Sequence, residues 1–364
     1  MERRTIDEAS LKWGRYRRPY LSPGDPSPAP SLDDEVLPMW VADMDIRAPP
    51  CVVSALESRV AGGMFGYTAP SDRLKQSVVS YLGRCVPTLP AECNRPSPDV
   101  WCGRLRRRQG WGVEPNWLVF VNGLVPALNL FCDIAGERGD AMIVPTPVYP
   151  PFLAAPGNTG RRLASVPLLP PTEGPADSEG ESGWRLDWAA MHAAATARYP
   201  DGGRARAVLL CSPHNPTGHV FSASELRKLD DFCAEHDLLL CSDEIHADLL
   251  LEPGASHTPA GACARSLADG VSRWAAALTP IALCVAASVS DRLAARTVTL
   301  FAASKTFNIP GLCAAFAVIP DPKLRLRFKR AMSGLITEVP CLGLTATEAA
   351  FVSAPPFRHR IESI

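Results

Sequence analysis

The sequence predicts an α/β fold in which a mostly parallel β-sheet is covered by helices on both faces. Three observations support this class: short, continuously apolar runs, stretches with helical spacing between them, and polar motifs directly after the runs. Strands that are buried on both faces, as in parallel sheets, have continuously apolar sequences. Ligands of open α/β sheets bind beyond the carboxyl ends of the strands, so the polar motifs mark the expected site.

The alternation of strands and helices begins near residue 117. A β-rich run at 117–121 leads through a short turn into helical spacing at 124–135. Short apolar strands are expected next at 141–144, followed by PTPVYPPF, and at 207–211, followed by the turn SPHNPTG. Each of these strands therefore ends in a motif of polar and turn-forming residues.

The next helix has a recognisable start. Ser222 and Glu225 have the spacing of a capping box, which predicts a helix that begins there. Its apolar positions recur on one face, which is expected to be buried: Leu226, Leu229, Phe232 and Cys233. Two more apolar strands are expected at 238–241, ending in SDEIH, and at 297–301, ending just before Ser304-Lys305.

Length, charge and hydropathy bound the possible partners. The 364 residues suffice for one large domain or two. The net charge is −1, and the one basic cluster, at 104–108, is interpreted as a solvated loop, so no nucleic-acid partner is expected. The apolar run at 274–289 contains Pro280 and is shorter than the about 20 residues of a spanning helix, so no membrane partner is expected.

Cysteine usage predicts a cytoplasmic protein with reduced thiols. The 12 cysteines are scattered, and none forms a CxxC pair. Cys211-x-x-His214 lacks a second pair of ligands, so no metal site is expected. The N-terminal stretch MERRTIDEASLKW shows no apolar segment of the kind that secretory signals contain.

The polar motifs after the strands converge on one chemistry. Lys305 follows an apolar strand, where burial disfavours a charge, and Asp243 follows another, where a carboxylate needs a cationic partner. Asn215 offers an amide donor in a rigid Asn-Pro turn, and the N–H groups of the helix that starts after Gly123 suit a phosphate. Taken alone, each of the last two motifs is more often an ordinary turn.

Together these motifs fit pyridoxal 5′-phosphate (PLP). A desolvated lysine has a lowered pKa and forms a Schiff base with the aldehyde of the cofactor. A carboxylate keeps the pyridine nitrogen protonated, an asparagine donates to the phenolic oxygen, an aromatic ring stacks on the cofactor, and a helix N-terminus holds the phosphate. Such a site explains why the charge of Lys305 stands at the end of a buried strand.

Motifs along the chain resemble, in order, those of the class I/II aminotransferase superfamily of fold-type-I PLP enzymes. Within it they are most similar to the MalY/PatB-like branch of cystathionine β-lyases and C–S lyases. The motifs are PMWVADMDI (38–46), MFGYTAP (64–70), PTPVYPPF (145–152), LLCSPHNPTGHVFSASEL (209–226), SDEIHADL (242–249) and AASKTFNIPG (302–311). The early stretch RTIDEASLKWGRY also resembles this branch, so the similarity runs from about residue 4 to 352.

The resemblance implies a role for each site residue. Lys305 would form the Schiff base, Asp243 would pair with the pyridinium nitrogen, and Asn215 would bond the phenolic oxygen. Tyr149 would stack on the ring. The phosphate would be held by the backbone amides of Gly123, Leu124 and Val125.

Further implications concern assembly and reaction type. Tyr67 resembles the tyrosine that reaches the phosphate from the neighbouring subunit, which implies a homodimer. His246 occupies the position where typical aminotransferases have a tyrosine near the phenolic oxygen, and DEIH in place of DxxY favours a lyase. Without the resemblance, His246 would be interpreted as an ordinary strand-end histidine. The Asn215-Pro216 bond is predicted to be cis, as in the similar turn of this fold.

The implied function is PLP-dependent carbon–sulfur β-elimination. The substrate would be a small sulfur amino acid, cystathionine or a cysteine S-conjugate, and the products pyruvate, ammonia and a thiol. Lys305, once freed from the cofactor, would take the Cα proton as general base. Two alternatives remain: an aminotransferase that uses the same residues, and a catalytically impaired PLP-binding or regulatory protein.

The resemblance also predicts a domain organisation. Residues 1–60 are expected to contribute to a small domain and to dimer contacts. Residues 61–352 are expected to form the PLP-binding large domain, with insertions at about 87–110, 170–184 and 264–295. Residues 353–364 are expected to be a short tail, without the C-terminal small domain that usually carries the arginine for the substrate carboxylate. That expectation motivates the catalytically impaired alternative.

Overall fold

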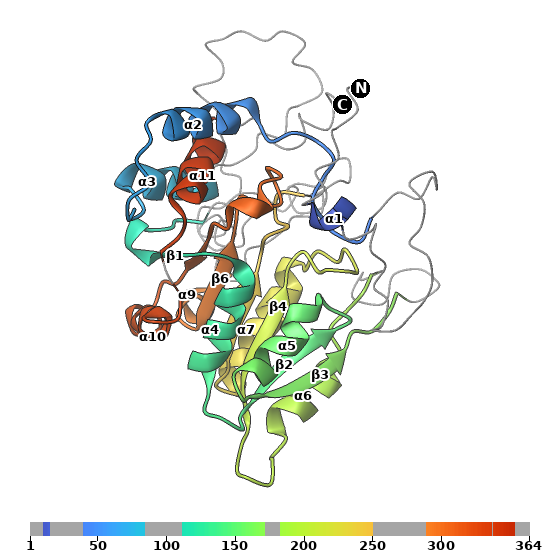
Figure 1. Ribbon diagram of the computed structural model, residues 1–364. Coiled ribbons are helices and arrows are strands. Elements are labelled where there is room, and N and C mark those ends of the chain that lie inside the picture. The colour runs from blue at the N-terminus through green and yellow to red at the C-terminus, as the bar shows by residue number, and fades with distance from the viewer. Residues whose placement is uncertain are drawn as a thin grey trace, which may run out of the picture.

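A mixed sheet forms the centre of the described part of the protein (Figure 1). The computed structural model describes residues 10–14, 39–83, 111–171, 183–249, 289–336 and 338–353. Its sheet is seven-stranded, with the order β1-β7-β6-β5-β4-β2-β3. Neighbouring strands are parallel except at β7, which is antiparallel to both β1 and β6. The predicted α/β class with a mostly parallel sheet is therefore confirmed.

The strands are short, and those inside the sheet are buried. They are β1 Leu118–Val121, β2 Ala141–Thr146, β3 Arg162–Pro167, β4 Ala205–Cys211, β5 Leu239–Asp243, β6 Thr297–Phe301 and β7 Ala315–Val318. Every residue of β6 and of β7 is buried. This burial is what continuously apolar strand sequences predict, because helices cover both of their faces.

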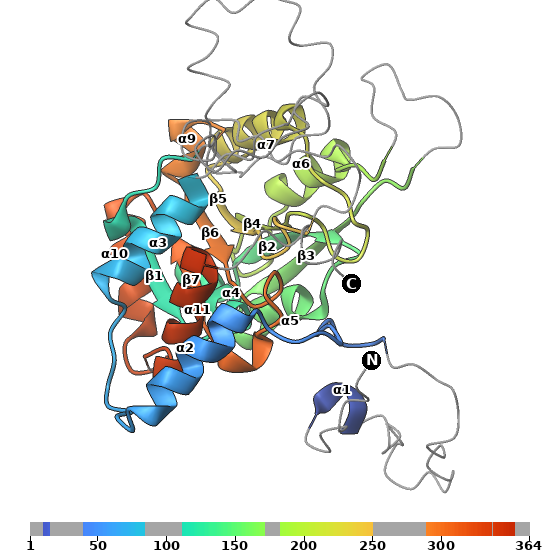
Figure 2. The same cartoon turned by 90° about the horizontal axis from the view of Figure 1, so that it is seen from above.

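Helices form a layer on each face of the sheet (Figures 1 and 2). One layer consists of α4 (Leu124–Ala135), α5 (Pro150–Asn158) and α10 (Pro322–Met332). The other consists of α6 (Trp188–Thr196), α7 (Ala223–Glu235) and α9 (Asp291–Ala294). Alternation along β4 separates the two cores, since Leu209 and Cys211 face the first layer whereas Val208 and Leu210 face the second.

A third group of helices packs beside the β1–β7 edge: α2 (Pro50–Ala61), α3 (Asp72–Gly83) and α11 (Cys341–Ser353). Its centre is aromatic, with the ring centroids of Tyr81 and Phe351 4.3 Å apart and Phe307 packed against both rings. The Tyr81 hydroxyl donates to Asp248 Oδ2 at 2.6 Å, and that oxygen also accepts from Thr306 Oγ1 at 3.0 Å. This group therefore supports the segment that follows β6.

The helix that was predicted from its capping box is α7. Ser222 Oγ accepts from the Glu225 N–H at 3.2 Å, and Glu225 Oε2 accepts from the Ser222 N–H at 2.7 Å. All the predicted face positions are buried: Leu226, Leu229, Phe232 and Cys233. The remaining described elements are short: α1 (Leu11–Gly14) and the 3₁₀ turns η2 (Pro115–Trp117) and η4 (Pro310–Leu312).

Several sequence-based expectations concern segments outside the described residues. These are the basic cluster at 104–108, most of the predicted insertions, the apolar run at 274–289 except for its last residue, and the tail from 354. Within the described part of the chain, no helix combines the length and the apolar character needed to cross a membrane.

Candidate active site

Lys305 lies in the turn that follows the buried strand β6. Backbone hydrogen bonds fix this turn, among them one of 2.9 Å from the Ile309 N–H to the carbonyl of Ser304. Burial lowers the pKa of Lys305 below its ordinary value, while the charges of Asp43 and Asp243 act in the opposite direction. An amine that holds its proton less firmly is suited to act as a nucleophile and as a base.

Asp243 is the last residue of β5, beside Leu300 of β6 in the parallel register. Its side chain is buried, and Oδ1 accepts a 3.1 Å hydrogen bond from the Ile245 N–H. Burial raises the pKa of Asp243 to about 7, although the Ile245 hydrogen bond and the charge of Lys305 both lower it. The described residues thus leave the carboxylate short of positive charge, which a cationic group of a ligand would supply.

Glu244, the residue after Asp243, is buried as well. Its Oε1 accepts a 2.8 Å hydrogen bond from Ser242 Oγ. Asp243 and Glu244 are therefore both buried, but of these two carboxylates Asp243 is the one whose charge raises the pKa of Lys305.

Asn215 and Tyr149 lie on two strand-end turns that are tied to each other. The Tyr149 N–H donates to the carbonyl of Asn215 at 3.0 Å. The buried ring of His214 bridges the same turns, with Nε2 2.8 Å from the carbonyl oxygen of Pro147 and Nδ1 3.1 Å from that of Cys211. Segments more than 60 residues apart in the sequence are thereby held at one end of the sheet.

His246 interacts both with the turn that contains Asn215 and with Lys305. Burial lowers the pKa of His246, as does the charge of Lys305, whereas a hydrogen bond with the carbonyl of Pro213 raises it. The ring is therefore neutral near pH 7 and can donate or accept a hydrogen bond beside the lysine. The predicted cis isomer of the Asn215-Pro216 bond is present.

The N-terminus of α4 contains the amides that were predicted to hold a phosphate. Gly123 is the N-cap residue, and Leu124 and Val125 begin the first turn. The first N–H groups of a helix have no acceptor within the helix, so they suit an anion. Asn122, directly before them, has a buried Oδ1 without a hydrogen-bond partner among the described residues.

Within one chain, Tyr67 does not lie with the other predicted site residues. It lies between α2 and α3, and its side chain is fully exposed, at 102% of the reference area. Its neighbours Met64 and Phe65 are exposed as well, at 77% and 54%. The role of Tyr67 in a neighbouring subunit stays a prediction.

Two residues beside Lys305 were not predicted, Asp43 and Asn308. The charge of Asp43 acts on Lys305, and its buried Oδ1 has no hydrogen-bond partner among the described residues. The Asn308 side chain accepts from the Met44 N–H at 2.9 Å and donates to the carbonyls of Met44 (2.8 Å) and Ile46 (2.6 Å). These bonds hold the segment that carries Asp43 against the turn that carries Lys305.

Lys12 anchors the same segment from the other side. Its Nζ lies 2.7 Å from Asp45 Oδ2 and 3.0 Å from the carbonyl oxygen of Asp43. Aspartates inside the otherwise apolar stretch PMWVADMDI were the available signal for this part of the site. What local sequence could not reveal is the partner, since Asn308 is 264 positions from Met44.

Buried side-chain oxygens without partners occur at this end of the sheet. They are Asn122 Oδ1 after β1, Ser212 Oγ after β4, and Asp43 Oδ1 beside Lys305; none has a hydrogen-bond partner within the described ranges. Buried polar atoms in proteins are nearly always paired. We interpret these oxygens as groups that a ligand satisfies.

The mostly parallel sheet flanked by helices is the architecture of PLP-dependent enzymes of fold type I. Residues 104–361 match the family Aminotransferase class I and II, and the chain belongs to this family.

Among curated proteins, the chain is similar to cystathionine beta-lyase PatB of Bacillus subtilis, with 33% identity over 325 residues. The match covers 89% of this chain and 67% of PatB. Among solved structures, OvoB has a TM-score of 0.71 at 32% identity, covering 98% of this chain and 73% of OvoB. Cystalysin from Treponema denticola, whose structure contains pyridoxal 5′-phosphate, has a TM-score of 0.71 at 27% identity, with the same coverage.

Proposed function

We propose that this protein is a PLP-dependent carbon–sulfur β-lyase. Its substrate would be cystathionine or another cysteine S-conjugate, which it would split with water into pyruvate, ammonia and a thiol. The observation that carries the proposal is the set Lys305, Asp243 and His246 at the carboxyl end of the sheet, in a chain similar to PatB and cystalysin.

The described residues fit PLP group by group. Asp243, whose raised pKa indicates missing positive charge, would accept from the pyridinium nitrogen. Asn215 would donate to the phenolic oxygen, and Tyr149 would lie on the ring. The phosphate would bind the amides that begin α4: Gly123, Leu124 and Val125. The bound cofactor supplies an electron sink that makes the Cα proton of the amino acid removable.

Lys305 would carry the proton in this reaction. Because burial lowers its pKa, a larger fraction of the amine is unprotonated near neutral pH than for an exposed lysine. An unprotonated Lys305 would attach the cofactor and, once released, would remove the Cα proton as general base. The neutral ring of His246 would leave the phenolic side of the site without a second positive charge.

Asp43 would recognise the ammonium group of the incoming amino acid. Its buried Oδ1 lacks a partner in the described part of the chain, and it lies close enough to Lys305 for its charge to act there. Asn308 and Lys12 hold its segment in place. A cation that approaches Lys305 would therefore be attracted to a carboxylate that is already positioned.

The working assembly would be a homodimer in the cytoplasm. Tyr67, Met64 and Met39 are strongly exposed, at 102%, 77% and 84%, which a second copy of the chain would cover. Tyr67 would then reach the phosphate of the partner's site. The described cysteines are free thiols, which is typical of a reducing compartment. The predicted division at residues 60 and 352 remains part of this proposal.

The test is pyruvate release from L-cystathionine by the purified chain, supplied with PLP and with no 2-oxo acid present. We expect release without any acceptor, together with one equivalent of thiol. Release of a 2-oxo acid only when an acceptor is added would identify an aminotransferase, the reaction named for a relative from Pseudomonas aeruginosa that is 28% identical over 60% of this chain. A chain that binds PLP but does neither would be the impaired alternative.

A further inference from the structure

Two histidines and a glutamate meet on the layer formed by α6 and α7, away from the lysine site. His192 lies in α6, Glu235 is the last residue of α7, and His236 follows it. His192 Nδ1 is 2.8 Å from His236 Nε2, and His236 Nε2 is 3.7 Å from Glu235 Oε1. All three ligand atoms lie within 4.8 Å of one another.

The two rings are held in place by the core. His192 packs edge-to-face on Phe232, with centroids 5.1 Å apart and planes at 82°, and His236 lies 4.9 Å from the same ring. Phe232 is itself only 2% exposed. The N–H of His236 also donates to the carbonyl of Phe232 at 3.2 Å. Packing on the buried Phe232 ring therefore holds both imidazoles in place, whereas the Glu235 side chain is 63% exposed and can change its conformation.

This cluster lies at the opposite end of the sheet from Lys305. β5 runs from Leu239, just after His236, to Asp243 at the carboxyl end. At about 3.3 Å per residue, the strand separates the two places by roughly 15 Å. A ligand at the histidines would therefore not touch the groups of the lysine site.

We propose that His192, Glu235 and His236 form a binding site for a divalent transition metal of the Zn²⁺ or Ni²⁺ type. Imidazole nitrogen with one carboxylate oxygen is a donor set that such ions prefer over Mg²⁺ or Ca²⁺. Ligand atoms about 2.0–2.2 Å from one ion are about 3 Å or slightly more apart. The distances of 2.8 Å and 3.7 Å are near this spacing, and the exposed Glu235 side chain can move to bring its oxygen closer to both histidines.

A metal in this site would join α6 to the end of α7. Water would complete the coordination, since the described residues supply three ligands. Because the ion would bind the folded chain and find no such arrangement in the unfolded one, it would raise the thermal stability of the protein. The site is structural in this account and takes no part in the lyase reaction.

The test is calorimetric titration of ZnCl₂ into the PLP-loaded chain, after removal of any affinity tag, of excess cofactor and of bound metal with a chelator. We expect one ion per chain and a higher Tm in its presence. Co²⁺ in place of Zn²⁺ should give the visible absorption of a nitrogen- and oxygen-ligated ion. A wild-type chain that binds neither ion would overturn the proposal.

Substitutions identify the ligands. Losing an outer partner of a ligand already weakens metal binding by about 10- to 100-fold, so His192→Gln and His236→Gln should weaken it by at least about 100-fold. Glu235→Gln removes an exposed carboxylate without touching the core, so it tests the site even if a histidine variant folds poorly. Unchanged affinity in all three variants would contradict the assignment.

A neighbouring aspartate provides the matched control. Asp237 adjoins His236, its side chain is 83% exposed, and its Oδ1 lies 3.9 Å from Arg296 Nη1. Asp237→Asn removes the same charge next to the site but none of the ligands, so it should bind Zn²⁺ as the wild type does. An equal loss in Asp237→Asn and Glu235→Gln would show general electrostatic attraction and overturn the site.

Discussion

Buried aspartates at the two ends of the sheet have opposite acid–base properties. Asp140 precedes β2 at the amino end, where Oδ1 accepts from the Arg204 N–H at 3.0 Å and Oδ2 from the Glu137 N–H and Arg206 Nε, each at 2.9 Å. Burial alone would raise the pKa of Asp140, but these hydrogen bonds and the Arg206 charge outweigh it and lower the pKa.

Asp243 shows the reverse at the carboxyl end. One backbone hydrogen bond, from Ile245, and the charge of Lys305 do not offset its burial, and its pKa is raised to about 7. The two side chains are similarly inaccessible to solvent, and the larger number of hydrogen-bond donors around Asp140 contributes to the opposite shifts.

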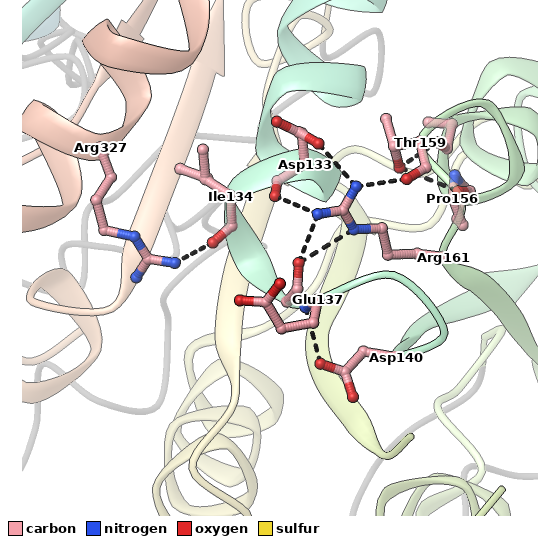
Figure 3. A network of polar contacts seen from close by, with 10 residues as sticks. Asp133, Ile134, Glu137, Asp140, Pro156, Thr159, Arg161 and Arg327 are labelled. Atoms are coloured by element: carbon pink, nitrogen blue, oxygen red, sulfur yellow. Dashed lines mark hydrogen bonds and ion pairs between the residues drawn. The ribbon is translucent and has the colours of Figure 1, made fainter. Parts of the chain in front are cut away.

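The last backbone carbonyls of α4, next to Asp140, also have hydrogen-bond partners (Figure 3). Arg161 donates to the carbonyls of Asp133 (2.6 Å) and Gly136 (2.6 Å) and pairs with the Asp133 carboxylate at 2.7 Å. Arg327 donates to the carbonyl of Ile134. The last carbonyls of a helix lack partners within the helix, so these arginines complete its C-terminus.

The comparison teaches that stability and function occupy different ends of one sheet. At the amino end, the Asp140 carboxylate and the last carbonyls of α4 are paired with other groups of the protein. At the carboxyl end it leaves Asn122 Oδ1, Ser212 Oγ and Asp43 Oδ1 without partners from the described chain and keeps Lys305 and Asp243 at shifted pKa values. Substitutions at the two ends should therefore have separable effects.

The largest effect is expected from Lys305→Ala. Loss of the general base alone should slow pyruvate release by about 10⁴-fold, because no other amine stands at that point of the turn. The free energy of unfolding of the cofactor-free chain should change by less than about 1 kcal/mol, measured by urea denaturation. Lys329→Ala, an exposed lysine of α10, is the control and should alter neither quantity.

Asp243→Asn is expected to have the next largest effect. A neutral amide cannot keep the pyridine nitrogen protonated, so turnover should fall by about 10²- to 10³-fold while some cofactor stays bound. Equal rates of Cα-proton removal in variant and wild type, followed in a single turnover, would move the role to Glu244.

Asp243→Asn should also change how the stability of the cofactor-free protein depends on pH. Because the folded pKa of Asp243 is raised to about 7, above the ordinary value of about 3.9, the folded state binds more protons than the unfolded state between these values. Stability of the cofactor-free wild type should therefore fall as the pH rises through this window, and Asp243→Asn should lack that fall. Identical profiles would contradict the raised pKa.

At the amino end, Asp140→Asn should cost stability and leave turnover unchanged. It breaks the charge-assisted bond between the buried Asp140 and the partly exposed Arg206, a loss of about 1.5–3 kcal/mol in the free energy of unfolding. The folded pKa of Asp140 is lowered, so its contribution is present above the ordinary aspartate value and is lost as the pH falls. The difference in the free energy of unfolding between variant and wild type should shrink on acidification. A lower kcat of the fully folded variant would contradict the separation of stability and function between the two ends of the sheet.

The smallest effect is expected from Asp43→Asn. Removal of one charge-assisted contact to the substrate ammonium, worth about 1.5–3 kcal/mol, should raise KM by about tenfold or more with a smaller change in kcat. A difference spectrum on binding of an unreactive amino acid should show the same loss of affinity. An unaltered KM with an unaltered spectrum would remove Asp43 from substrate recognition.

Local sequence predicted the parts of the fold that it encodes locally. The helix at 124–135 and the strand at 297–301 coincide with α4 and β6, and the capping box starts α7 where expected. β3 was not predicted because it is an edge strand whose exposure alternates, so it lacks a continuous apolar run. β7 was not predicted either, and its antiparallel direction depends on pairing with β1, almost 200 residues away.

The positions of the site residues were likewise predictable only where local sequence encodes them. Lys305, Asp243 and Asn215 each follow a strand, so their positions at one end of the sheet could be inferred from the order of strands and helices. The position of Asp43 beside Lys305 could not be inferred, because it depends on the hydrogen bonds between Asn308 and the segment 44–46. Contacts of that kind have no local pattern.

Chemical mapping can show directly whether the carboxyl end of the sheet binds PLP through Lys305. The purified chain is incubated with PLP, reduced with borohydride and digested, and the labelled peptide is identified by mass spectrometry. The account predicts one phosphopyridoxyl group per chain, on Lys305 in the peptide that contains SKTFNIPG. A label on Lys12 or Lys228, or no stable label at all, would contradict it.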